Sequence, residues 1–256
     1  MVEVVEVAVV FPVGHSVVVF LVEGELLALG KMDIDKFLTK EQKQQVNKAV
    51  VKAEKKTNAE IVPIITDSSG QYDRAEDIVG LITAVVSVAI IWIYTQQATI
   101  GEWGKTQYQY SLTLIIATII VAFAIGAFLA SRIWFIRHLF TPRSEMKRCV
   151  ARGAQRAFYE FELWKTSDSS AVVIYISLFE RMVYVLGDKK IRKKFEDKDF
   201  AEVRDVIVAN LRCNKRCEAL CEGITKCGEK LKQHFPSNKS KKNQLEDHLR
   251  IFKQNL

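Results

Sequence analysis

Two uncharged apolar stretches, residues 78–98 and 111–131, restrict the possible folds of this chain more than any other feature. Each holds 21 residues, and a helix of that length rises about 30 Å, the thickness of the hydrocarbon core of a bilayer. Neither has the polar stripe of a helix with one face in water. Two buried helices in a soluble core are the alternative, but Trp92 near the end of the first stretch, Trp103 in the connection and Trp134 after the second stretch are typical of membrane interfaces. The pattern predicts a transmembrane hairpin.

Small residues recur along the second stretch at Ala122, Gly126 and Ala130. A spacing of four residues places them along one side of a helix. Small side chains let the backbones of two membrane helices approach closely. We therefore expect this side of the second helix to lie against a neighbouring helix.

Basic residues are distributed unequally around the two stretches. Seven Lys and Arg residues lie between Arg132 and Arg156, whereas the connection 99–110 contains only Lys105. Lys and Arg are retained on the cytoplasmic side of membrane proteins. We expect both termini to be cytoplasmic and the connection to be external. The odd number of cysteines, five, also suits a reducing compartment.

Residues 1–31 form an N-terminal extension that is rich in Val and Glu and has no basic residue before Lys31. A secretory signal needs a positive N-terminal region, so the extension does not match one. It could be a β-rich extension or a weakly structured tail. A third interpretation is that the protein starts at Met32, because MDIDKFLTKEQ opens with a helix signal.

The segment before the first stretch predicts a helix followed by a strand. TKEQKQQVNKAVVKAEKKT has apolar residues at helical spacing, and Thr39 with Gln42 resembles a capping box. AEIVPIIT reads as a strand, in which Pro63 favours an edge position or a bulge.

The segment after the second stretch predicts a helix, a β-hairpin and further helix. TPRSEMKRCVARGAQRAFYEFEL is basic and amphipathic, and its cations could contact anionic headgroups or form a solvated face. AVVIYISL and RMVYVLGD read as paired strands. From Phe200 we expect one long helix, or two with a break near Gly223, ending at Pro236.

This order of elements, with TNAEIVPIIT in the first half and TSDSSAVVIYISLFERMVYVLGD in the second, resembles the TPM domain family. That domain also occurs in a thylakoid lumen protein with acid phosphatase activity and in an auxiliary subunit of acetylcholine receptors. The resemblance implies an α/β fold, an α/β/α sandwich with a small mixed sheet, here interrupted by the membrane hairpin. The residues that carry it are Glu54, Thr57, Glu60, Ile61, Tyr72, Ala75, Thr166, Asp168, Val173, Ser177, Glu180, Arg181, Gly187 and Asp188.

The resulting domain organisation places one α/β domain on both sides of the hairpin. Its two halves must then face the same compartment, which an even number of spans ensures. The expected segments are the extension 1–31, the first domain half 32–77, helix 78–98, external loop 99–110, helix 111–136, the second domain half 137–235 and a tail 236–256.

Three carboxylates are the candidate metal ligands. If the first two strands run parallel and the third returns antiparallel, then Glu60, Asp168 and Asp188 lie at the same end of the sheet. Oxygen ligands of this kind suit Ca²⁺ or Mg²⁺. The alternative is that Glu60 pairs with a nearby Lys, while Asp168 and Asp188 are turn residues that accept hydrogen bonds from local backbone amides.

The other reactive residue types do not form a recognisable catalytic motif. Cys213, Cys217 and Cys221 stand four apart and could line one helix, but without C-x-x-C turns we interpret them as small core residues. The four histidines are scattered, and no phosphate-binding or dinucleotide-binding glycine motif is present.

These observations favour an accessory or interaction protein in the membrane, with the bilayer and another membrane protein as partners and divalent metal as a possible ligand. The alternative that the resemblance permits is a metal-dependent phosphatase acting on phosphomonoesters. Nucleic acid is not an expected partner, because much of the net charge of +7 flanks the second span, where the orientation of the hairpin explains it.

Overall fold

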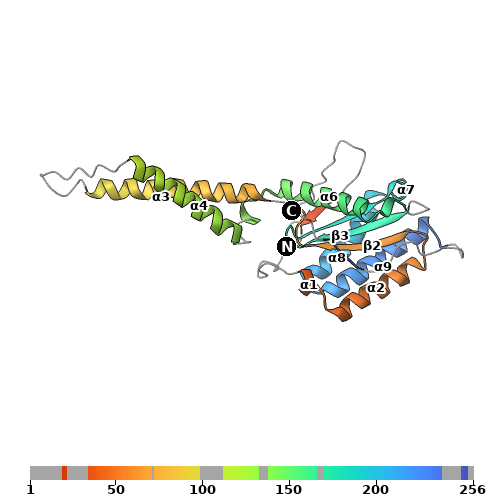
Figure 1. Ribbon diagram of the computed structural model, residues 1–256. Coiled ribbons are helices and arrows are strands. Elements are labelled where there is room, and N and C mark those ends of the chain that lie inside the picture. Colours follow the sequence, from red (N-terminus) through yellow and green to blue (C-terminus); the bar gives the residue numbers. More distant parts are fainter. Residues whose placement is uncertain are drawn as a thin grey trace. The chain divides into compact units, whose positions relative to one another are not determined.

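The computed structural model describes residues 19–21, 34–70, 72–98, 112–132, 138–165, 170–237 and 249–252. The chain divides into two compact units (Figure 1). The first combines Met1–Gly70 with Ser144–Leu256, and the second is Gln71–Arg143. The first unit has a mixed α/β fold, and the second is a pair of helices.

A five-stranded mixed sheet forms the centre of the first unit, in the order β1-β4-β3-β2-β5. β2 pairs in parallel with β3 and β5, whereas β4 pairs antiparallel with β3 and β1. The predicted β3–β4 hairpin is confirmed. The strands are β1 (Val19–Leu21), β2 (Glu60–Thr66), β3 (Ala171–Ser177), β4 (Met182–Gly187) and β5 (Arg250–Ile251).

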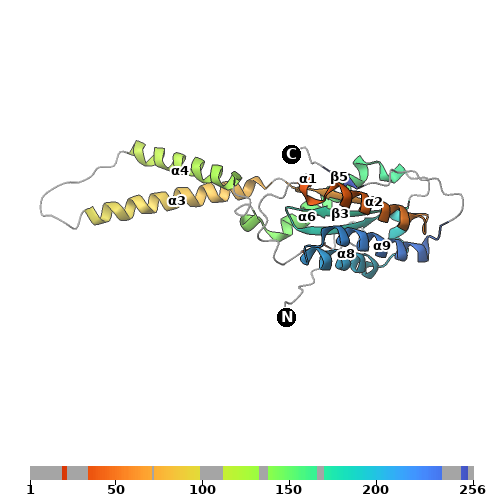
Figure 2. The ribbon, with the colours of Figure 1, turned by 90° about the horizontal axis from the view of Figure 1, so that it is seen from below.

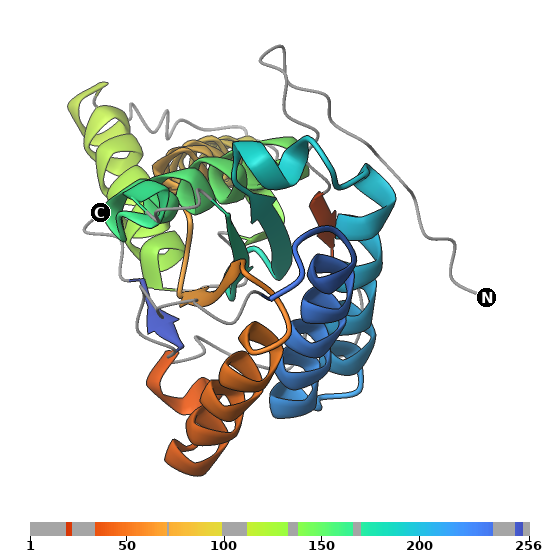
Figure 3. The ribbon, with the colours of Figure 1, turned by 90° about the vertical axis from the view of Figure 1, so that its right-hand side faces the viewer.

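Helices lie on both faces of the sheet. α2 (Lys40–Glu54), α8 (Asp197–Arg212) and α9 (Arg216–His234) pack on one face, where Ile61, Ile174 and Val185 belong to the same buried apolar cluster as residues of these helices. α6 (Arg143–Glu160) covers the other face (Figures 2 and 3). Shorter helices complete the unit: α1 (Ile34–Phe37), the 3₁₀ turn η2 (Leu163–Lys165) and α7 (Lys189–Arg192).

Residues 1–31, for which three interpretations were open, contribute β1. Its backbone pairs with β4 from Val19↔Tyr184 to Leu21↔Met182. Other predictions for this segment lie outside the described residues.

The segment after Phe200 is two helices, and the break differs from the predicted position near Gly223. α8 ends at Arg212 and α9 begins at Arg216, with Asn214 between them in the left-handed region at φ 57°. Asn tolerates this conformation better than most residues. Gly223 instead lies inside α9, where a Cβ would come within 2.2 Å of Ile207 Cγ1. Gly223 therefore permits close packing of the two helices.

The N-terminus of α2 and the position of Pro63 follow from local chemistry. Thr39 and Gln42 form the predicted capping box. In β2, the Ile61 N–H and the Ile65 carbonyl both point away from β3, because they bond to Glu54 and Phe252. The nitrogen of Pro63 has the same orientation by the two-residue period of a strand. Pro63 therefore removes no bond to β3, and it removes none to β5, because β5 pairs only from Ile64 onward. The predicted edge position of Pro63 is wrong, since β2 is an internal strand.

The second unit contains α3 (Asp73–Ala98) and α4 (Leu112–Arg132), which pack against each other. α3 begins before the predicted residue 78, because the charged DRAED segment continues the helix. A Cβ on Gly126 would lie 2.5 Å from Thr83 Oγ1, and Gly126 and Ala130 are buried. The predicted close approach along this side of the second helix is confirmed. Residues 133–136 of the predicted span lie outside the described part.

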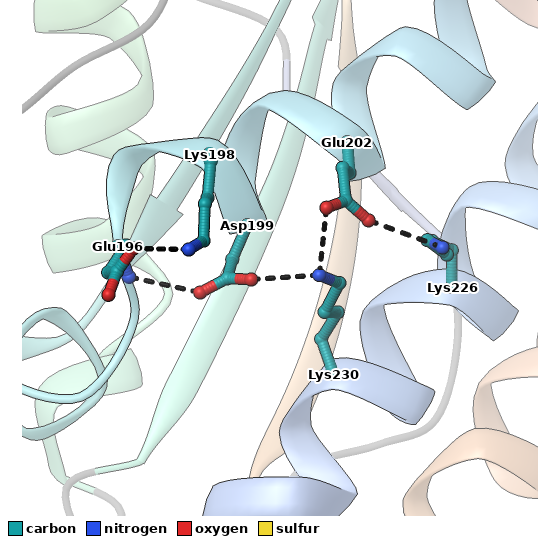
Figure 4. A network of polar contacts seen from close by, with 6 residues as sticks. All are labelled: Glu196, Lys198, Asp199, Glu202, Lys226 and Lys230. Carbon is teal, nitrogen blue, oxygen red and sulfur yellow. Dashed lines mark hydrogen bonds and ion pairs between the residues drawn. The ribbon is translucent and has the colours of Figure 1, made fainter.

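An ion-pair network joins α8 to α9 in the first unit (Figure 4). Lys230 Nζ lies 2.9 Å from Asp199 Oδ1 and 3.0 Å from Glu202 Oε1, and Lys226 adds a contact of 3.3 Å to Glu202. The Asp199 Oδ2 atom accepts the backbone N–H of Glu196 at 3.0 Å. The network therefore ties the start of α8 to the last turns of α9.

The pKa of Asp199 reflects opposing influences. Burial raises the pKa of this carboxyl, but the Lys230 hydrogen bond, the Glu196 backbone N–H and the charges of Lys230 and Lys198 together hold it below its usual value. A group whose pKa is depressed on folding stabilises the folded state above its unfolded pKa, and this contribution is lost as the pH falls through the folded pKa.

We predict that Asp199→Asn lowers the free energy of unfolding by roughly 1 kcal/mol at neutral pH. The difference from wild type should be fully present above about pH 3.8, the ordinary pKa of this carboxyl, and should shrink below it as the pH approaches the depressed pKa of folded Asp199. Denaturant unfolding at several pH values measures this. Asp197→Asn is the control, because it makes the same substitution at an exposed residue of α8 outside the ion-pair network. An equal loss for both variants would contradict the prediction.

Candidate functional site

Two of the three predicted metal ligands lie in one row across the sheet. Glu60 is the first residue of β2 and pairs with Ala171 of β3. Asp188 directly follows β4, and its backbone N–H donates to the Ala171 carbonyl at 2.9 Å. Residues opposite each other in a sheet place their side chains on the same face. Glu60 and Asp188 therefore lie on one face at one end of the sheet, with the small side chain of Ala171 between them. Asp168 lies outside the described residues.

The spacing of this row is compatible with two ligands converging on one ion. The two carboxylates are two strand spacings apart, about 10 Å between backbones. Glu60 is 3% exposed, so its carboxylate is largely removed from water. Among the described residues, no group of three or more His, Cys, Asp and Glu side chains is placed to hold a metal ion. A complete site would need a further ligand, and Asp168 is the predicted one.

The alternative role of Asp188, as a turn residue that accepts a backbone hydrogen bond, is present in the structure. Asp188 is the N-cap of α7, and its Oδ1 accepts the N–H of Lys189 at 2.5 Å. A carboxylate oxygen has two lone pairs, and its partner oxygen has two more. Capping therefore orients Asp188 without using its full capacity as a ligand.

A second polar group lies at the opposite end of the parallel strands and was not predicted as a site. We call Ser69, Tyr175, Ser177 and Glu180 the Glu180 cluster. Ser69 Oγ lies 2.8 Å from Ser177 Oγ and 3.1 Å from the Tyr175 hydroxyl, and Ser177 Oγ also donates to Glu180 Oε2. The backbone N–H of Ser69 donates to Glu180 Oε1 at 2.7 Å. The fully buried Glu180 thus joins the turn after β3 to the segment after β2.

The surroundings of Tyr175 keep its hydroxyl protonated. Burial raises the pKa of Tyr175 to about 12; the Ser69 hydrogen bond lowers it, and the charge of Glu180 raises it. Gly153 of α6 passes directly above, where a Cβ would lie 2.6 Å from the Tyr175 hydroxyl. The cluster is enclosed between strand and helix, which suits a structural role better than attack on a substrate.

The sequence did contain a signal for this cluster. Ser177 and Glu180 are among the residues that carry the family resemblance, although the resemblance assigns them no role. Tyr175 and Ser177 are also two residues apart in a strand of otherwise apolar residues, which places two hydroxyls on one face. The partner Ser69 comes from a segment more than 100 residues earlier, so the strand pattern alone does not identify it.

The cysteines largely behave as the predicted core residues. Cys217 and Cys227 are buried, Cys221 is half-buried, and Cys213 is exposed at the end of α8 rather than on the stripe of α9. Burial raises the pKa of the Cys227 thiol to about 12, and burial with the neighbouring Cys217 does the same for Cys221. Neutral thiols are poor metal ligands.

These observations define the class of protein as a mixed α/β domain that carries an apolar two-helix unit. The unit is inserted between β2 and β3, the two long strands that pair in parallel. No protein-family model matches the chain, and the comparison with curated proteins gives no match. Among solved structures, the chain is similar to the NMR structure of BA42 protein from the psychrophilic bacterium Bizionia argentinensis. The two share 16% identity over 86% of this chain and 99% of that one, with a TM-score of 0.52. This likeness concerns the fold alone.

We predict that Glu180→Ala lowers the free energy of unfolding by about 2–3 kcal/mol, because it leaves buried donors without their acceptor. Denaturant unfolding measures the effect. Ser68→Ala is the matched control, since the Ser68 hydroxyl reaches Glu180 only at 3.4 Å. If Glu180→Ala were as stable as Ser68→Ala, the cluster would not hold the two segments together.

Proposed function

We propose that this chain is an integral membrane protein whose TPM-like domain lies on the cytoplasmic side and acts as an accessory or interaction module for a membrane complex. The observation that carries the proposal is the parallel pairing of β2 and β3 over seven residues, although the apolar helices α3 and α4 lie between these strands in the chain. One folded domain thus holds both ends of the apolar insertion.

The character of α3 and α4 supports membrane insertion. Each contains an apolar segment long enough to cross a bilayer, and only 11% of either segment is buried within the protein. A core helix of a soluble protein would be mostly buried, and a signal sequence would lie near the N-terminus. Large apolar side chains instead remain exposed along both helices, including Leu81, Trp92, Leu112 and Phe128.

The continuity of the sheet and the distribution of charge support the proposed orientation. β2 precedes α3 and β3 follows α4, so pairing requires both flanking segments to be on the same side of the membrane. The excess of Arg and Lys after the second helix favours the cytoplasmic side.

The interaction role rests on the resemblance to the TPM family. It also rests on the structural roles of the polar groups at the two ends of the sheet. The Glu180 cluster is enclosed, and Asp188 caps a helix. Divalent metal binding by Glu60, Asp168 and Asp188 belongs to the same proposal, supported by the common row of Glu60 and Asp188. Ca²⁺ or Mg²⁺ bound there could order the sheet end for a partner membrane protein. A metal-dependent phosphatase is the alternative use of these carboxylates.

We predict that a membrane-impermeant maleimide labels Cys213 only after the cell membrane is permeabilised, because Cys213 is an exposed thiol of the domain placed in the cytoplasm. A cysteine introduced by Thr106→Cys, in a Cys213→Ser background, should instead be labelled in intact cells. Gel-shift counting of the maleimide measures both. Labelling of Cys213 in intact cells would overturn the proposed orientation, and extraction of the chain by alkaline carbonate would overturn insertion.

We predict that the full chain in detergent binds Ca²⁺ or Mg²⁺ in calorimetric titration, and that Asp168→Asn and Asp188→Asn each abolish binding. Asn retains the capping ability of Asp188 but removes its charge. Asp197→Asn, an exposed residue of α8, is the control. Absence of binding at millimolar metal would contradict the site. Metal-dependent hydrolysis of a generic phosphomonoester that both variants lose would favour the phosphatase, whereas binding without hydrolysis would favour the interaction module.

A further inference from the structure

The side of α6 that faces away from the sheet carries a row of arginines. Arg148, Arg152 and Arg156 are exposed and stand four residues apart, which places them along one side of the helix. Tyr159, 66% exposed, continues this side by nearly another turn. We call these four residues the α6 arginine face. The opposite side of α6 is apolar and buried against the sheet, with Met146, Val150, Ala154 and Ala157 each at most 1% exposed.

None of the three arginines makes an ion pair within the described part of the protein. Glu145 stands three residues before Arg148 and Glu160 four after Arg156 on the same helix, but neither lies within ion-pair distance of an arginine of this face. Arg152 turns back along its own helix, with Nε 3.4 Å from the Arg148 carbonyl and Nη2 3.6 Å from Cys149 Sγ. Like charges four residues apart on a helix repel one another. An anionic surface beside α6 would relieve this repulsion.

The connection limits how far the start of α6 can lie from the membrane, if α4 spans it. α6 begins at Arg143, eleven residues after α4 ends at Arg132. Even fully extended, eleven residues reach only about 40 Å. The orientation of the hairpin accounts for Arg148 and Arg152, because topology depends on cations within about 15–20 residues of a span. Arg156 lies 24 residues beyond Arg132 and is outside that distance.

A second basic row in the same domain serves for comparison. Lys48, Lys52 and Lys56 have the same four-residue spacing along α2 and just beyond it, and all three are exposed. α2 and α6 lie on opposite faces of the sheet, so one flat surface cannot contact both rows (Figure 3). Arg148 lies 16 residues after the end of α4 and Lys56 lies 17 residues before the start of α3, so distance along the chain does not separate the two rows. The α6 row differs in its chemistry. It consists of arginines, which bind phosphate through two parallel hydrogen bonds, and it ends in a tyrosine suited to the membrane interface.

We propose that the α6 arginine face lies on the anionic phospholipid headgroups of the cytoplasmic leaflet, with Arg148, Arg152 and Arg156 bound to lipid phosphates and Tyr159 at the interface. This contact rests on the proposed membrane insertion of α3 and α4. It goes beyond that insertion, because it assigns the α/β domain one face toward the bilayer and leaves the α2 side open to a protein partner.

The test places a single tryptophan on the face. The full chain carries Tyr159→Trp together with Trp92→Phe, Trp103→Phe, Trp134→Phe and Trp164→Phe, and is reconstituted into nanodiscs with brominated acyl chains near the headgroups. Discs of phosphatidylcholine with phosphatidylserine are compared with discs of phosphatidylcholine alone. We expect the indole introduced at position 159 to be quenched in anionic discs, and the quenching to be lost in 1 M salt, where charges are screened beyond about 3 Å.

Two charge variants of this reporter complete the test. Arg148→Gln with Arg152→Gln and Arg156→Gln should abolish the quenching, whereas Lys48→Gln with Lys52→Gln and Lys56→Gln should leave it unchanged. Circular dichroism of each variant confirms that the domain is folded.

Each outcome bears on a separate claim. A chain that is not retained in the discs would overturn membrane insertion itself. A retained and folded chain whose reporter is not quenched in anionic discs would overturn the lipid contact alone. An acidic protein surface would then be the remaining candidate partner of the α6 arginine face. Equal loss of quenching in the two charge variants would also overturn the proposal, because net charge rather than this face would then be responsible.

Discussion

The parallel pairing of β2 with β3 is the interaction on which the rest of the structure depends. It joins residues 60–66 to residues 171–177, so more than 100 residues lie between its partners. Closing so long a loop costs conformational entropy, although the cost grows only slowly with loop length. The helices α3 and α4 make the insertion a unit of its own, so the sheet does not have to order a long irregular loop. The cores on both faces of the sheet exist only once this pair has formed.

Buried polar contacts secure both ends of that pair. At the N-terminal end of β2, where β5 does not reach, Glu54 Oε1 accepts the Ile61 N–H at 2.7 Å, and the Thr57 hydroxyl donates to the Phe235 carbonyl at 2.7 Å. At the other end, the Leu178 N–H donates to the Thr66 carbonyl and Glu180 accepts the Ser69 N–H. A buried donor left unsatisfied is costly. These contacts therefore hold β2 at both of its ends, which favours a single register of its pairing with β3.

Much of the architecture could be predicted from local patterns. The capping box at Thr39, the β3–β4 hairpin and the side of α4 marked by Gly126 and Ala130 all follow from short-range spacing. The break between α8 and α9 was misplaced because a glycine is read as a helix breaker, whereas Gly223 is required by the proximity of Ile207. The role of Glu180 was missed for a related reason, since its partner Ser69 belongs to a distant segment. Asp168 lies outside the described residues, so the three-carboxylate site stays a prediction.

By itself, the sequence determined the type of each main element and the apolar character of the inserted hairpin, because periodicity, caps and the lack of charge act over a few residues. The tertiary structure decided which distant residues meet: Glu60 in one row with Ala171 and Asp188, Glu180 with Ser69, and Gly153 over Tyr175. It also decided that α2 and α6 present their basic rows on opposite faces of the sheet. These contacts depend on pairing and packing between segments far apart in the chain. The spacing of residues within one segment does not specify which distant segment it meets.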